Sequence, residues 1–232
     1  MQYGGKWTGC FVAEPYQLVD DEELFLFLLV MEMLERQFGA VSANTDLLFS
    51  EAFWAAEASV AVREIAQTLT EFMMNGANIS LQDTELVFVE SVPELFENVR
   101  FAAEKHAGEL IRGINETTRD KVAALLEQSI VDNWSLDELT EALTGGPFGE
   151  VRARLVAVSE TTNSYIQGAA YAADELRNAG YQATLIWNTV RDDRVCQICE
   201  PRDGQPQGSN WSEEKGAHPG CRCFTTTEVT KI

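Results

Sequence analysis

The pattern of apolar and polar positions predicts helices over the first third of the chain. Residues 20–38 space their apolar side chains three and four positions apart, open with acidic residues and precede Gly39, which is typical of an amphipathic helix. Residues 46–75 repeat this spacing, and we expect Gly76 to end the second helix. Additional apolar residues widen the stripe of the first helix, so we expect it to be buried on most sides or to face a partner.

The helical pattern continues after a connection. Residues 77–93 have no helical period and contain a candidate strand at 86–89. Residues 94–132 then predict a further helix, with a break near Gly108 or Gly113 because glycine weakens helix interiors.

Two further helices follow in the second half. Ser135 and Glu138 have the spacing of a capping box, which predicts a short helix beginning there. Residues 151–176 alternate apolar spacings of four and three, which indicates a heptad-like seam. Such a seam needs a partner helix, and we expect residues 106–132 to supply it.

The C-terminal end has a different pattern. Residues 183–190 and 224–229 have the composition of β-strands, and a cluster of cysteines lies between them. We therefore expect a mainly α (α+β) fold: a helical bundle with a small C-terminal β element around a Cys/His cluster. Residues 1–104 are expected to form a helical, partner-docking region and residues 105–232 a second domain, with the metal module at about 187–229.

Composition and charge limit the function classes. Hydrophobic residues make up 45% and charged residues 23%, so the chain can bury a real core and extensive disorder is excluded. The 37 acidic and 17 basic residues give a net charge of −20, which opposes strong binding to DNA phosphates.

The longest apolar run, Leu24–Met31, is far too short to span a membrane, and the start lacks the order of a signal peptide. We expect no membrane partner and synthesis in a reducing compartment.

Four of the five cysteines fall near the end of the chain, together with one of the two histidines. Their pattern is Cys196-x2-Cys199-x18-His218-x2-Cys221-x1-Cys223. Two ligands from each of two tight turns are typical of a tetrahedral zinc site, so we predict one structural zinc ion. Five donors compete for four positions, and the spacing leaves open whether Cys221 or Cys223 is the fourth ligand.

Other interpretations of the cysteines are a metal-free core of reduced thiols, an iron–sulfur cluster or a redox pair. Cys10 stands alone and is expected to be a packed apolar residue. A catalytic zinc is disfavoured, because the histidine of the cluster is followed by Pro219 and the chain has no His-Glu-x2-His motif.

No other signature of an enzyme is present, so we expect no catalytic activity and no small-molecule substrate. The chain contains neither a phosphate-binding Gly-x4-Gly-Lys loop nor a Gly-x-Ser-x-Gly nucleophile elbow. His106 is expected to be a structural histidine. Glu160 is expected to lie on a solvated helix face, with a contact to the zinc module as the alternative.

Several stretches of the C-terminal half together resemble a known family. They are Arg152–Tyr165, Trp187–Thr189, Asp193–Cys199, Gly204 and His218–Cys223. In this order they are similar to the phage Mu F-like head morphogenesis family, over about residues 105–229. The family often has Thr in place of Ser159 and Pro in place of Gln197.

The resemblance implies a minor head protein of a tailed phage. Such a protein would act in procapsid assembly, dock on the portal or the inner capsid shell, and assist DNA packaging or ejection. It would be made in the host cytoplasm and reside inside the capsid of the virion. The alternative is a zinc-stabilised module that contacts the phage genome weakly.

Overall fold

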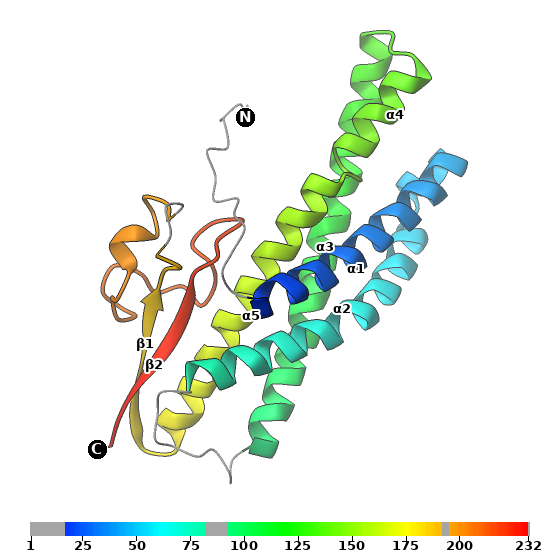
Figure 1. Ribbon diagram of the computed structural model, residues 1–232. Helices are drawn as coiled ribbons and strands as arrows, with labels where there is room; N and C mark the ends of the chain where they lie inside the picture. Colours follow the sequence, from blue (N-terminus) through cyan, green and yellow to red (C-terminus); the bar gives the residue numbers. More distant parts are fainter. Residues whose placement is uncertain (1–16, 82–91, 192–194, 232) are drawn as a thin grey trace.

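The computed structural model describes residues 17–81, 92–191 and 195–231. These residues are mainly helical and end in a small antiparallel sheet (Figure 1), which confirms the predicted fold class. The candidate strand at 86–89 and Cys10 lie outside the described residues. The elements are α1 (Gln17–Ala43), η1 (Thr45–Phe49), α2 (Glu51–Ser80), α3 (Val92–Val131), α4 (Leu136–Gly145), α5 (Glu150–Asn178), β1 (Tyr181–Asn188), η2 (Glu200–Arg202) and β2 (Phe224–Lys231).

The bundle is built around α2, which packs against both α3 and α5. Its core draws on α1, α2, α3 and the first half of α5, and none of its largest side chains is exposed: Leu26, Met33, Leu34, Ile65, Leu69, Met73 and Ile111 are at most 1% exposed. The predicted partner of the α5 seam was wrong. Among the helices, α5 packs chiefly along α2 and next along α1, with only a minor contact to α3. Its buried face consists mainly of small residues, and Gly168 on α5 and Gly76 on α2 let these two backbones approach closely.

Glycines make the crossing of α2 and α5 close. A Cβ atom at Gly168 would lie 1.8 Å from the Met73 carbonyl oxygen, and one at Gly76 would lie 2.2 Å from that of Tyr165. The sequence predicted that Gly76 would end α2, and this prediction is wrong. The helix continues to Ser80, because the missing side chain serves the contact with α5 and not a turn.

The predicted break in the next helix is also absent. α3 runs from Val92 to Val131 without interruption. The buried side chains of Ala107, Ile111 and Ile114 anchor the stretch that contains Gly108 and Gly113, and this packing outweighs a cost of about 1 kcal/mol for each glycine. The expected domain boundary at residue 104 therefore lies inside a continuous helix.

Polar side chains tie the helices together. The Glu22 carboxylate on α1 accepts hydrogen bonds from Asn75 on α2, at 2.8 Å, and from the Tyr165 hydroxyl on α5. Arg152 at the start of α5 donates to the Pro147 carbonyl at 2.6 Å and to the Ile114 carbonyl at 3.0 Å. The capping box of Ser135 at α4 forms as predicted.

The sheet packs on the second half of α5 (Figure 1). β1 and β2 pair antiparallel from Tyr181↔Lys231 to Asn188↔Phe224. Alternate residues of β1 point inward and form a second core with α5, with Leu185 and Trp187 fully buried. α5 thus belongs to both cores. No helix among the described residues has the length and apolar composition that crossing a membrane requires.

Candidate metal centre

The loop between the two strands folds back onto β1. Gly204 donates to the Trp187 carbonyl at 2.8 Å, and Gln207 donates to the Leu185 carbonyl at 2.8 Å, so residues 204–207 pair with the edge of β1 that β2 leaves free. The indole of Trp187 contacts that of Trp211 edge-on at 5.1 Å between ring centroids. These contacts hold the middle of the loop between the two strands against β1.

Two tight turns present the donor side chains. In the first, the Cys196 carbonyl accepts hydrogen bonds from the amides of Cys199 and Glu200 at 3.0 and 2.9 Å. In the second, Cys221 donates to the His218 carbonyl at 3.1 Å, and Gly220 adopts a positive φ of 73°. The left-handed conformation is readily accessible to glycine, and it lets His218 and Cys221 turn towards the first pair.

All five predicted donors line one small cavity of about 10 Å³. Cys196, Cys199 and His218 form one group whose ligand atoms lie within 4.8 Å of one another, and Cys199, Cys221 and Cys223 form another. Cys199 belongs to both groups and is buried. Each of these two groups can hold a metal ion.

Two of the distances between donor atoms match the edges of a tetrahedral zinc site. Zinc–sulfur and zinc–nitrogen bonds of about 2.3 and 2.0 Å give tetrahedral edges of about 3.8 Å between sulfurs and about 3.5 Å between sulfur and nitrogen. The Cys199 and Cys221 sulfurs are 3.8 Å apart, and the Cys199 sulfur is 3.5 Å from His218 Nε2. The Cys196 sulfur lies closer to the same nitrogen, at 3.1 Å.

The cysteines of the cluster differ in pKa, so some of them lose the thiol proton more readily than others. Hydrogen bonds from the Cys199 and Cys223 thiols lower the pKa of Cys221, while the pKa of Cys199 is raised by its hydrogen bonds to the same two thiols and by burial. Burial opposes ionisation of Cys196, but hydrogen bonds from Cys199 and the Ile198 amide, together with the charge of His218, outweigh it and leave the pKa of Cys196 below its ordinary value. Thiolates are the form that binds metal, and Cys196 and Cys221 are the two cysteines of the cluster whose surroundings favour that form.

Three polar side chains of α5 hold the second turn in place. The Ser159 hydroxyl accepts from the Gly220 amide at 2.8 Å, the Thr162 hydroxyl donates to the Cys221 carbonyl at 2.6 Å, and the Asn163 side-chain oxygen accepts from the Gly216 amide at 2.9 Å. Sequence analysis did not assign these roles. The signal that could have indicated these contacts is the group of short polar residues at 159–164, on a helix whose other buried residues are mainly alanines.

Glu160, in the middle of this segment, faces away from the metal donors. Its carboxylate contacts His106 Nε2 on α3 at 2.6 Å. Glu160 is therefore not on a solvated face, since both side chains are largely shielded from solvent, with 13% and 21% exposed. His106 thereby connects α3 to the part of α5 that holds the module.

Charged groups of the module mostly pair with one another. Asp203 accepts from the backbone amide and hydroxyl of Thr189 and pairs with Arg191 at 3.1 Å. Arg202 pairs with Glu213 at 3.0 Å and lies 5.2 Å from the centre of the Trp187 ring. These pairs brace the outer side of the loop. Asp192 and Asp193 lie outside the described residues.

Comparison of the chain with family models, characterised proteins and solved structures finds no match in any of the three.

Proposed function

We propose that this chain is a structural protein of a phage head, a minor head protein that docks on the portal or the inner shell during procapsid assembly and assists DNA packaging or ejection. One observation supports the proposal. The α5 stretch that carries the resemblance contacts the His218–Cys223 stretch through Ser159 and Thr162. These segments are about 60 residues apart in sequence. Their contact means that the two stretches that carry the resemblance together hold the second turn of the Cys/His cluster.

The metal in this proposal is one structural zinc ion. Thiolate and imidazole donors are the set that zinc prefers. Four of the five donors are enough for a tetrahedral shell without an open position for water, once the two triads that share Cys199 draw together around the ion. Cys196, Cys199 and His218 are three ligands. Cys221 is the favoured fourth, because its sulfur lies at the tetrahedral edge distance of 3.8 Å from that of Cys199.

Zinc would stabilise a loop that has little core of its own. The segment between Asn188 and Phe224 contains one short 3-10 helix, η2, among its described residues, and its buried side chains are few. Binding of zinc to a site that the unfolded chain lacks contributes directly to folding. The module then presents a fixed surface for a partner, with no catalytic role.

Co-expression tests the proposal. The chain is produced together with the portal protein of the same source, and the complex is analysed by size-exclusion chromatography with light scattering. A stoichiometric complex is expected with this portal, but not with the portal of an unrelated phage. If the folded, zinc-loaded chain binds neither the portal nor the major shell protein of its source, the docking proposal fails.

Weak binding of the phage genome is the alternative, and it has less support. Arg191 and Arg202, two basic side chains of the module, are paired with Asp203 and Glu213, and the net charge of −20 repels nucleic acid. A gel-shift assay with duplex and single-stranded DNA at low salt separates the two proposals. A salt-sensitive shift that disappears in Arg191→Glu would favour the alternative.

A further inference from the structure

The end of α3 and the whole of α4 form a helical hairpin that extends beyond the bundle core (Figure 1). Val122 is the last buried residue of α3, and no residue from Ala123 to Gly146 is buried. The part of α3 beyond Val122 is about 14 Å long at the helical rise, and α4 packs chiefly against α3. The hairpin, residues 123–146, therefore gains little stability from burial.

Hydrogen bonds at its turn keep the hairpin ordered without burial. The Trp134 amide donates to the Ser129 carbonyl at 2.9 Å, and Asn133 between them has a positive φ of 53°, which is typical of a Schellman motif at the end of a helix. Ser135 and Glu138 form the capping box that begins α4. The turn is thus built before any partner binds, and such preorganisation lowers the entropic cost of binding.

Large apolar side chains beside this turn are exposed. Ile130 and Leu136 are each 78% exposed, and Val131 is 71% exposed. No large apolar side chain among the described residues is more exposed than the first two. All three residues, which we call the apex, lie within one helical turn of the connection between α3 and α4. Single exposed apolar residues are common on protein surfaces, whereas a group of them is typical of an interaction site.

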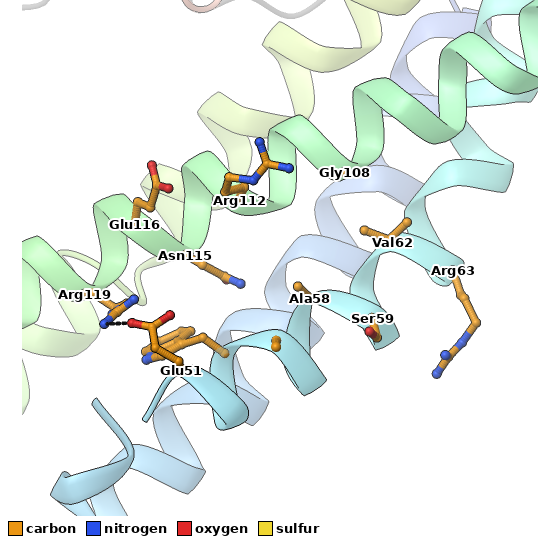
Figure 2. Close-up of a pocket in the computed structure, with 12 residues that line it drawn as sticks. Glu51, Ala58, Ser59, Val62, Arg63, Gly108, Arg112, Asn115, Glu116 and Arg119 are labelled. Atoms are coloured by element: carbon orange, nitrogen blue, oxygen red, sulfur yellow. Dashed lines mark hydrogen bonds and ion pairs between the residues drawn. The ribbon is translucent and has the colours of Figure 1, made fainter. Parts of the chain in front are cut away.

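The charge of the hairpin differs from that of the rest of α3. Closer to the bundle core both signs occur together, since Arg112, Glu116 and Arg119 line the groove between α3 and α2 (Figure 2). Between Lys121 and Arg152 there is no lysine, arginine or histidine. The acidic residues of the same stretch are Glu127, Asp132, Asp137, Glu138, Glu141 and Glu150. In the part of the chain that the structure describes, none of these carboxylates forms an ion pair.

The sign of this charge limits what can cover the apex. A second copy of the chain would bring the same carboxylates against it, and nucleic acid or an anionic membrane surface would be repelled. A protein surface with an apolar pocket bordered by lysine and arginine complements both the exposed side chains and the charge.

We propose that the apex inserts into an apolar pocket, bordered by basic side chains, on the protein that this chain docks on. The three apolar side chains fill the pocket, and carboxylates of the hairpin pair with the basic border. The inference rests on the proposed function, in which the portal or the inner shell is that partner. It assigns part of the docking to the hairpin, outside the metal module.

Binding of apex variants tests the apolar part of this inference. The full chain is titrated by biolayer interferometry against the portal or the major shell protein, whichever forms the complex with it. Ile130→Ser/Leu136→Ser is expected to bind about tenfold more weakly, or worse, because it removes the apolar side chains at the centre of the contact. The control is Phe101→Ser, which alters a side chain of α3 that is 69% exposed and lies outside the hairpin. It should bind like the unmodified chain.

A charge-reversal variant tests the basic border. Glu127→Lys/Glu141→Lys is expected to bind about tenfold more weakly and to lose most of the salt dependence of binding, because attraction becomes repulsion. Glu109→Lys/Glu228→Lys changes the net charge equally at exposed positions outside the hairpin, and it should retain both the affinity and the salt dependence. Circular dichroism and thermal unfolding verify that each variant is folded.

The proposed function and the role of the hairpin fail in different ways. If the unmodified chain forms no complex with either partner, the proposed function fails, and the docking role fails with it. If the complex forms but the hairpin variants bind as tightly as the unmodified chain, or no more weakly than their controls, the role of the hairpin alone is overturned. It is also overturned if the unmodified chain self-associates in sedimentation and Ile130→Ser/Leu136→Ser is monomeric, because a second copy then covers the apex.

Discussion

Thr162 illustrates how single side chains outside the module determine its geometry. It lies 59 residues before Cys221, and its hydroxyl donates to the Cys221 carbonyl. The spacing of cysteines and histidine predicted which donors would meet, because ligand spacing is a local property of two turns. It could not predict the contacts of Ser159, Thr162 and Asn163, since hydrogen bonds between distant segments leave no period in the sequence.

The fourth ligand can be identified by single substitutions. Cys221→Ser is expected to reduce zinc from about one ion per chain to nearly none and to lower the stability of the sheet, because a serine hydroxyl is a poor zinc ligand. Cys223→Ser is expected to retain the ion, and Cys10→Ser is the control. Metal analysis of the purified proteins and thermal unfolding provide the readouts. Retention of zinc by Cys221→Ser with loss in Cys223→Ser would reverse the assignment.

Tyr165 makes stability depend on alkaline pH. Burial, followed by the hydrogen bond to Glu22, raises the pKa of the Tyr165 phenol above its ordinary value near 10. The folded state therefore keeps this proton where the unfolded state loses it. This contribution to stability is complete below pH 10 and declines as the pH rises further.

The variant Tyr165→Phe is expected to lose about 1–3 kcal/mol at neutral pH, since the hydroxyl donates to a carboxylate. Its stability should also fall less steeply above pH 10 than that of the unmodified protein. Urea unfolding at pH 7 to 11 measures both effects. Parallel pH profiles for the two proteins would show that the phenol does not titrate differently on folding.

At the scale of elements, the apolar period predicted the helices well and their ends and partners less well. Gly76 was interpreted as a helix stop, and Gly108 and Gly113 as a break, because glycine disfavours helix in isolation. In the structure the first permits a close crossing, while packing beside the other two keeps α3 continuous. The sequence shows where a glycine is, but not whether another backbone lies against it in the folded protein.

This difference between glycines is testable. Gly168→Ala is expected to destabilise the protein by about 2 kcal/mol or more, because the new Cβ would lie 1.8 Å from the Met73 carbonyl oxygen. Gly113→Ala, where nothing lies within 4 Å of the added atom, should stabilise by about 0.5–1 kcal/mol through helix propensity. Chemical denaturation compares the two. Equal effects would mean that α2 and α5 do not cross this closely.

At the scale of the whole molecule, two hydrophobic cores share one helix. The bundle core lies around α2, and the smaller core lies between the sheet and the second half of α5. The composition of the C-terminal end predicted a separate module, but it could not predict that α5 would carry it. The function proposed for the chain rests on the resemblance to phage head proteins, and the co-expression experiment tests it.

Removal of the metal should affect the two cores unequally. A chelator is expected to increase amide hydrogen exchange in β1, β2 and the loop between them, because the loop loses the interaction that closes it. The amides of α2 in the bundle core should exchange as slowly as before. Loss of protection throughout the chain would mean that the two cores unfold as one unit.

The register of the sheet also has a mechanical consequence. Lys231 pairs with Tyr181, which is separated from the end of α5 by two residues, while Phe224 pairs with Asn188 near the cysteines. A pull on the chain beyond Lys231 thus opposes the anchor of β1 at the same end of the sheet. Such a load opens the strands one pair at a time, as a zipper, and reaches Cys223 last. The candidate metal centre is therefore at the protected end of the sheet, because such a load first breaks the backbone hydrogen bonds between β1 and β2.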